Sequence, residues 1–222
     1  MTVSRSRTLY PPHPDLFIDN IALATSDSFK VLGVTFDSKL TFEYHIRSIS
    51  KGIAQKVGIL RKCRRNFGDE AILMNCFNSF ILPCLEYCSP VWSSAADSHL
   101  KLLDKSLSAI KFLIPNLRTD LWHRRCISSL CLLYKIAANE HHPLHASLPD
   151  FFIPARNTRY AASRNSRAYA SVRFNTTQYS RCFIPAITKL WNELPSLVAE
   201  SVLLQKFKLG ANSFLLGRLG ND

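Results

Sequence analysis

The sequence predicts a mainly α-helical protein of the α+β class, with a short amino-terminal β-hairpin or strands. Apolar residues recur at helical spacing over most of residues 44–138, the signature of amphipathic helices. A run of β-branched and aromatic residues, bounded by turn residues, precedes that region. The chain has 222 residues, of which 47% are hydrophobic, and this is enough to bury a core.

The amino-terminal 43 residues are expected to form two or three short strands. Apolar pairs lie on both sides of Asp19-Asn20, and a second apolar, β-branched run extends from Phe29 to Phe36. Asp19-Asn20 and Asp37-Ser38 supply residues that favour turns. The stretch VLGVTFDSKLTF, residues 31–42, is therefore interpreted as a β-hairpin that leads into a helix.

The first helix is expected to begin at Tyr44 and to run to Arg65, with a basic polar side. Its apolar positions are Ile46, Ile49, Ile53, Val57 and Leu60. A solvated helix face is the ordinary explanation of such charges. The density of positive charge favours contact with nucleic-acid phosphates instead. The residues proposed for this contact are Arg47, Lys51, Lys56, Arg61, Lys62, Arg64 and Arg65.

Further helices are predicted from periodicity and from helix-ending residues. Asp69-Glu70 begin a second helix that Pro83 is expected to interrupt, because proline lacks an amide hydrogen. A short turn is expected over residues 85–92. The remaining helices are expected at about Ala95 to Ile114, Leu121 to Ala138, Ile184 to Leu194 and Ser201 to Leu216.

The chain divides into units with different composition. They are short strands at 1–43, a helical bundle at 44–138, a basic linker at 139–182 and carboxy-terminal helices at 183–222. No acidic residue lies between Asp150 and Glu193. Arginines alternate there with Tyr160, Tyr169, Phe174 and Tyr179, a mixture that can stack on bases and contact phosphates; a disordered linker is the alternative. The arginines proposed for binding are Arg156, Arg159, Arg164, Arg167 and Arg173.

The formal net charge of +12 indicates a polyanionic partner. Nucleic acid, RNA or DNA or both, is the first candidate, and an anionic membrane surface is the second. The first residues contain no apolar signal-peptide core, and no window reaches the roughly 18 apolar residues of a membrane span. We therefore expect an intracellular protein that is not secreted and does not cross a membrane.

Metal and nucleophile chemistry find little support in the sequence. Cys84 and Cys88 form a C-x3-C pair without the second pair that structural zinc needs. The histidines at 141, 142 and 145 are interpreted as a polar loop. Cys126 lies three residues after His123, which is interpreted as helix packing. There is no G-x-S-x-G and no glycine-rich phosphate loop, so we expect no catalytic residue, metal site, cofactor or small-molecule substrate in this chain.

Five separated blocks carry a family resemblance. They are VLGVTFDSKLTFEYHIRSISKGIAQKVGILRKC, FILPCLEYCSPVWSSAADSHLKLLDK, LWHRRCISSLCLLYKI, HPLHASLP and FIPAITKLWNELP. Together, in this order, they resemble the carboxy-terminal part of jockey-type non-LTR retrotransposon reverse transcriptases. The resemblance implies that Leu32, Gly33 and Val34 belong to a primer-grip-like hairpin. It also implies that the following helices form a thumb and that the remainder is the post-thumb region.

The resemblance further implies a missing catalytic part. Polymerisation needs carboxylates that hold two divalent metal ions, magnesium in this family, and these belong to the upstream palm. This chain contains no Asp-Asp pair. We therefore expect a fragment of an RNA-directed DNA polymerase, inactive alone and nuclear if functional. A recruited stand-alone nucleic-acid-binding module, or the non-functional product of a decayed element, are the alternatives; the DNA upstream of Met1 would separate them.

Overall fold

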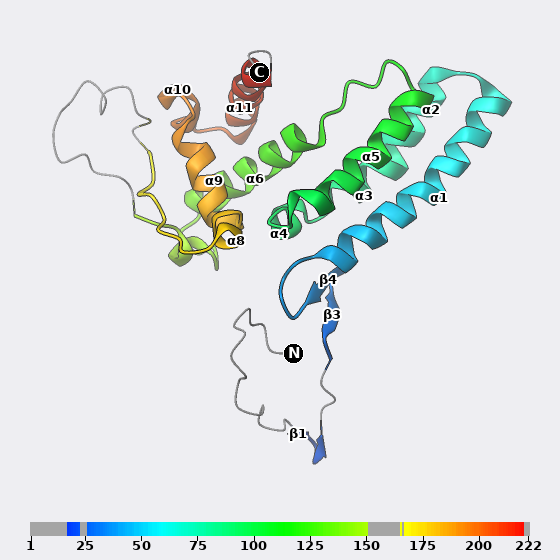
Figure 1. The fold of residues 1–222 in the computed structure, drawn as a ribbon. Coiled ribbons are helices and arrows are strands. Elements are labelled where there is room, and N and C mark those ends of the chain that lie inside the picture. The colour runs from blue at the N-terminus through cyan, green and yellow to red at the C-terminus, as the bar shows by residue number, and fades with distance from the viewer. Residues whose placement is uncertain (1–16, 23–25, 151–164, 166, 220–222) are drawn as a thin grey trace.

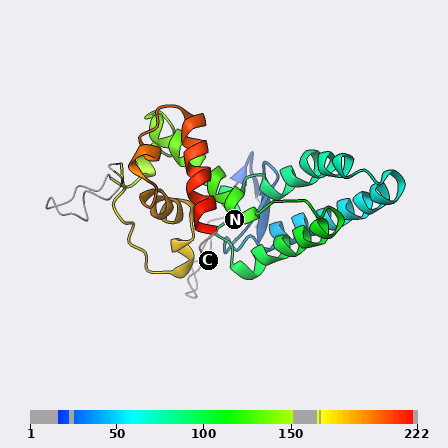
Figure 2. The same ribbon diagram turned by 90° about the horizontal axis from the view of Figure 1, so that it is seen from above.

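The computed structural model describes residues 17–22, 26–150, 165 and 167–219. Figures 1 and 2 show two helical lobes side by side, with the strands at the base of the first. One lobe contains helices α1 to α5, and the other contains α6 together with the carboxy-terminal helices. The prediction of a mainly helical fold with short antiparallel strands is confirmed.

The strands form two separate antiparallel pairs. β1 (Phe17–Ile18) pairs with β2 (Ile21–Ala22) around Asp19-Asn20, which confirms that predicted turn. β3 (Ser28–Val31) pairs with β4 (Val34–Asp37), and Val31 lies opposite Val34. The second turn is therefore Leu32-Gly33. Asp37-Ser38 begin a further turn after β4, as predicted, in which the Leu40 amide donates to the Asp37 carbonyl at 2.9 Å.

The backbone at Leu32 and Gly33 explains where the hairpin turns. Leu32 and Gly33 have φ angles of 46° and 87°, and two consecutive positive values are typical of the two-residue turn that best matches strand twist. Asp37 ends β4 and organises the loop that follows. The hairpin therefore spans residues 28–37 rather than 31–42.

Helix α1 (Glu43–Phe67) forms as the spacing predicts, and α5 (Asp97–Leu113) packs alongside it (Figure 1). Phe42 precedes α1 with a φ of 57°, and Leu40 also has a positive φ, of 50°. Gly68 ends the helix in the left-handed conformation that favours glycine. The core side of α1 buries Ile46, Ile53, Val57 and Leu60.

The chain continues as a helix through Pro83, so the predicted interruption is wrong. Asp69 caps α2 (Glu70–Cys76), a π-helical turn follows at Phe77–Ile81, and α3 (Leu82–Glu86) contains the proline. The amide of Leu82 donates to the carbonyl of Phe77, five residues earlier. Pro83 then lies in the first turn of α3, where an amide hydrogen is not required.

The second lobe is built on α6 (Leu121–Ala138), which has its predicted bounds. Its first residue, Leu121, belongs to the core of the first lobe, whereas Ile127, Leu130 and Leu133 belong to a second core. The other elements are α4 (Ser89–Trp92), a 3-10 turn at His145–Ser147, α8 (Thr177–Ser180), α9 (Phe183–Asn192), α10 (Ser196–Ala199) and α11 (Leu204–Leu219). The predicted division of the chain into four units stays a prediction.

The described end of the predicted linker packs on this second core. Tyr169 is 2% exposed, and its backbone exchanges two hydrogen bonds of 2.8 Å with the Asn192 side chain. The indole of Trp191 donates to the carbonyl of Arg167. Tyr169 is therefore a core residue, and its expected role in stacking on bases is corrected.

The cysteines and the helix surfaces add two findings. All seven cysteines have free thiols and are half-buried. Among the helices that the structure describes, none combines the length and apolar character that a membrane crossing requires.

Candidate nucleic-acid interface

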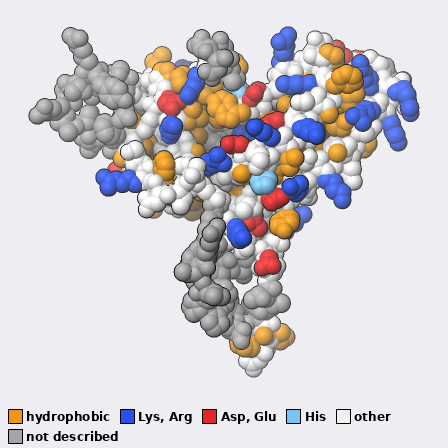
Figure 3. Space-filling model, viewed as in Figure 1, with side chains coloured by type: hydrophobic (Ala, Val, Ile, Leu, Met, Phe, Trp, Pro, Cys, Tyr) orange, Lys and Arg blue, Asp and Glu red, His pale blue; other side chains and the backbone are white. Residues whose placement is uncertain are grey.

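Five of the seven basic residues predicted on α1 lie along one side of that helix. Successive residues of an α-helix are about 100° apart, which places these five within an arc of roughly 100°. The arc is turned away from the buried face, and all five side chains are exposed. Figure 3 shows Lys and Arg side chains gathered over this lobe. We call this set the α1 basic stripe: Arg47, Lys51, Arg61, Lys62 and Arg65.

Most of the stripe is electrostatically uncompensated. Lys51, Arg61, Lys62 and Arg65 make no hydrogen bond or ion pair with any residue that the structure describes. Glu43 is the one acidic residue in the sequence of α1, and its carboxylate lies 2.7 Å from Nε of Arg47. An exposed pair of this kind contributes little stability. Four cations therefore remain available to an external anion.

The other two predicted residues are engaged within the protein. Nζ of Lys56 donates to the Phe80 carbonyl at 2.6 Å and lies 2.8 Å from Sγ of Cys84. Nη1 of Arg64 donates to the Phe112 carbonyl at 3.0 Å. Both side chains therefore join α1 to neighbouring helices, and the structure does not bring them together with the stripe.

The primer-grip-like residues occupy the tip of the hairpin. Leu32 is 84% exposed, whereas Val34 is 3% exposed and belongs to the core. The hydroxyl of Tyr87 donates to the Leu32 carbonyl at 2.7 Å. A Cβ added at Gly33 would lie 3.4 Å from the ring of Tyr87. The tip is therefore accessible and is held by the residue that follows α3.

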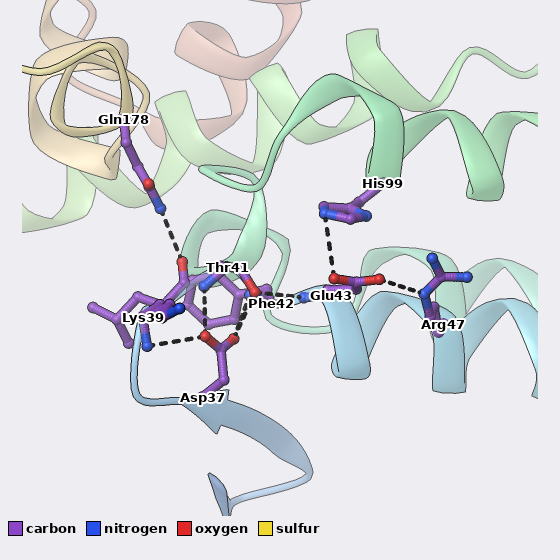
Figure 4. A network of polar contacts seen from close by, with 9 residues as sticks. Asp37, Lys39, Thr41, Phe42, Glu43, Arg47, His99 and Gln178 are labelled. Carbon is purple, nitrogen blue, oxygen red and sulfur yellow. Dashed lines mark hydrogen bonds and ion pairs between the residues drawn. The ribbon is translucent and has the colours of Figure 1, made fainter. Parts of the chain in front are cut away.

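Asp37 fixes the junction between the hairpin and α1 (Figure 4). Its carboxylate accepts hydrogen bonds from the amides of Lys39, Thr41 and Phe42 at 2.8 to 3.0 Å, and from the Thr41 hydroxyl at 3.0 Å. Burial alone raises the pKa of this carboxyl, but the four donors together outweigh it and hold the pKa below its ordinary value. The junction is therefore stabilised by a charged group.

Two further contacts position the hairpin. Nδ1 of His45, in the first turn of α1, accepts the Thr35 amide at 3.4 Å. Burial, and next the charge of Lys30, lower the pKa of His45, so the neutral imidazole is favoured. From the other lobe, the Gln178 side chain donates to the Leu40 carbonyl at 3.1 Å (Figure 4). The hairpin and the stripe thus keep a fixed relative placement.

The arginines of the predicted linker that the structure describes are not brought to the stripe. Arg167 and Arg173 are exposed, and they lie in the segment beside the carboxy-terminal helices, in the second lobe (Figure 1). Arg156, Arg159 and Arg164 lie outside the described residues. Among the described residues, the predicted contacts therefore fall on two separate surfaces.

One comparison with known proteins found a relative of part of this chain. Over 89 residues, 39% of this chain, the sequence is 33% identical to the RNA-directed DNA polymerase from mobile element jockey of Drosophila melanogaster. Part of this chain is similar to a reverse transcriptase. The chain spans about 10% of the length of that jockey polymerase. No protein-family model and no solved structure matches the chain.

Three residues have structural roles that the sequence did not reveal. Arg125 is buried, and its Cζ lies 5.1 Å from the centre of the Trp92 ring. Tyr87 and Asp37 had no assigned role in holding the hairpin. Their partners are backbone groups, which no side-chain pattern reveals. In the part of the chain that the structure describes, no three His, Cys, Asp or Glu side chains are grouped to hold a metal ion.

Proposed function

We propose that this chain holds a nucleic acid by its phosphates along the α1 basic stripe, as the primer-grip, thumb and post-thumb part of a retrotransposon RNA-directed DNA polymerase. The observation that carries the proposal is the set of exposed, unpaired cations at a fixed placement beside the hairpin tip. The partial similarity to the jockey polymerase supports it.

The dimensions of the stripe fit backbone contact. From Lys51 to Arg65 the helix rises about 21 Å, at 1.5 Å per residue. One nucleic-acid strand presents about six phosphates over that length. Lysine and arginine side chains without other partners can follow such a row, and contacts of this kind set position rather than sequence preference. We therefore propose recognition of RNA, DNA or their hybrid by shape and charge.

The hairpin would contact the strand beside this row. Leu32 projects from a turn whose carbonyl is held by Tyr87, so its side chain can pack on a sugar or base without losing the turn. On this proposal Leu32 and Gly33 at the tip contact the strand, and the buried Val34 anchors the grip in the core. The polymerising carboxylates and their magnesium ions would be supplied outside this chain, which alone would bind nucleic acid without extending a primer.

A salt titration of binding tests the proposal. The 222-residue chain is titrated with a fluorescent RNA–DNA hybrid at several salt concentrations. Lys51→Gln, Arg61→Gln and Lys62→Gln together should reduce the slope of log K against log salt by about three, because each phosphate contact releases close to one counterion.

The matched control removes three charges from the other lobe. Lys135→Gln, Lys206→Gln and Lys208→Gln lie on exposed positions of α6 and α11, and we expect the wild-type slope to remain. Binding that is absent at low salt would overturn the proposal. So would equal losses in the stripe variant and the control variant.

A further inference from the structure

Arg125 is a buried cation whose donors lack acceptors. Its side chain enters from α6 and the residue is 8% exposed. Nε and Nη2 are buried, and neither has a hydrogen-bond partner among the residues that the structure describes. Burial lowers the pKa of this guanidinium. A buried donor without an acceptor costs free energy, and most buried donors in proteins have a hydrogen-bond partner. The unpartnered Arg125 guanidinium therefore requires an explanation.

Protein neighbours do not supply the missing acceptors. The Trp92 ring stacks on Arg125, but the guanidinium donors lie in its plane and ring stacking leaves them unused. Nearby carboxylates have other partners: Glu86 pairs with Arg124, and Asp120 accepts the amide of His123. Asp104 interacts with Arg125 electrostatically, without a hydrogen bond.

Arg125 lines a cavity of about 330 Å³ between α6 and α9. Three further cationic side chains reach the same cavity: Arg181, Lys189 and Arg218. The one acidic residue in its lining is Glu193, which pairs with Arg218. Arg181 pairs with Asp97 at 3.0 Å, outside the lining. The cavity is therefore strongly cationic.

The rest of the lining is suited to a small ligand. Leu100, Trp122, Phe183 and Ile187 provide apolar walls, and ligand pockets are mostly apolar with a few placed polar groups. Arginine donors favour oxygen anions, which they bind through parallel hydrogen bonds. Several cations around one buried arginine favour a doubly charged group over a single carboxylate.

We propose that this cavity binds a phosphate group, with Arg125 as its innermost donor and Lys189, Arg181 and Arg218 around the entrance. The site lies between the two lobes, where Leu100 of α5 faces α6 and α9, and it goes beyond the function proposed above. The phosphate could come from a nucleic-acid strand or from a free mononucleotide or inorganic phosphate. The chemistry is the same, and the test separates the sources.

The first measurement is the thermal stability of the full chain in sodium phosphate against sodium chloride at equal ionic strength. Binding to the folded state raises Tm as the ligand concentration increases, so a phosphate-specific rise is expected. Arg125→Met should weaken the apparent phosphate affinity about tenfold or more, the size of one charge-assisted hydrogen bond. The control, Lys135→Met, should respond like the wild type.

A second variant and a comparison of ligands complete the test. If Arg125→Met does not fold, Lys189→Met replaces it, because Lys189 is exposed and lines the cavity; a weakened response is again expected. Adenosine monophosphate and a short oligonucleotide are then compared with phosphate, and the strongest Arg125-dependent or Lys189-dependent response identifies the source.

Three results would overturn the site. They are no phosphate-specific rise in the wild-type protein, an unchanged response in Arg125→Met, or, where that variant does not fold, an unchanged response in Lys189→Met. The stripe variant separates this proposal from the proposed function. Lys51→Gln, Arg61→Gln and Lys62→Gln should lose hybrid binding while keeping the full phosphate response.

Discussion

The Tyr87 hydroxyl donates a hydrogen bond of 2.7 Å to the Leu32 carbonyl, 55 positions earlier in the chain. Tyr87 is itself held, because its carbonyl accepts the indole N–H of Trp92 at 2.8 Å. Trp92 is fully buried and carries Arg125 on its ring. The tip of the hairpin is thus connected by direct contacts to the core of the first lobe.

Tyr87→Phe should loosen the hairpin tip without unfolding the lobe. The substitution removes one hydroxyl and keeps the ring that lies beside Gly33. We expect faster hydrogen exchange in β3 and β4 and unchanged exchange in α5, as measured by mass spectrometry. Tyr44→Phe, on an exposed ring of α1, is the control and should change neither. Unchanged exchange in β3 and β4 of Tyr87→Phe would show that the hydrogen bond does not hold the turn.

Asp37→Asn should destabilise the junction of the hairpin and α1. The amide keeps one acceptor oxygen but loses the charge, so the four donors are no longer fully satisfied. Hydrogen bonds to charged groups are worth about 1.5 to 3 kcal/mol, and we expect a loss of about 2 kcal/mol in the free energy of unfolding by urea. Asp27→Asn, at an exposed position, should cost little. Equal losses in the two variants would contradict the assigned role.

The pKa of His45 predicts a pH dependence of stability. The folded-state pKa is lowered, whereas the unfolded chain titrates near about 6.5. As the pH falls below that value, the unfolded state binds the proton first, so the free energy of unfolding decreases. The contribution is complete above about pH 6.5 and is lost as the pH falls toward the folded pKa.

Urea denaturation at pH 7.5, 6 and 5 measures this effect, and His45→Gln should show a weaker decrease than the wild type. The lowered pKa of Asp37 acts in a separate window, because its contribution is lost only below its ordinary value of about 3.9. Parallel decreases in the wild type and in His45→Gln above pH 5 would contradict the assignment.

Substitution of Lys56 should affect mainly the stability of the protein, and substitution of Lys51 mainly its binding of nucleic acid. Lys56→Met removes a donor to the Phe80 carbonyl and should cost about 1 kcal/mol of stability, with little change in the salt slope of hybrid binding. Lys51→Met should leave the free energy of unfolding unchanged and reduce the slope by about one. The reverse pattern would reject the division of α1 into a stripe and an anchoring side.

Cys126 should be unreactive in the folded protein. Burial, followed by the charge of Asp120, raises the pKa of its thiol to about 12, and the thiolate is the reactive form. At pH 8 its alkylation should be about a thousandfold slower than in the urea-unfolded chain, where the thiol has an ordinary pKa near 8.5. Peptide mapping after iodoacetamide labelling measures the ratio. A ratio near one would contradict the burial of this side chain.

The helices were predictable because each carries its own signal. The bounds of α6 agree with the prediction, since Asp120 caps its start and apolar residues repeat through to Ala138. The hairpin turn and the path through Pro83 were not predictable from local rules. A leucine rarely adopts a positive φ, and a π-helical turn has no sequence signature that distinguishes it from an ordinary helix.

The sequence predicts which residues of the candidate site are charged, but not which of them form hydrogen bonds within the protein. Periodicity located all seven basic residues of α1, yet only the structure shows that Lys56 and Arg64 bind carbonyls of other helices. Tyr169 illustrates the same limit, because its aromatic character suited both base stacking and a core. Long-range contacts decided between the two, and these are not encoded in spacing.

The positive φ angles of Leu32, Leu40 and Phe42 have a consequence for protein engineering. Each such conformation costs a residue with a side chain roughly 1 to 2 kcal/mol, so residues 28–42 do not favour this path by themselves. Asp37, Tyr87 and the buried Phe42 ring offset that cost from outside the turn. Grafting the hairpin of residues 28–37 and its following loop onto another helix would therefore not reproduce their shape unless these three supports were transplanted as well.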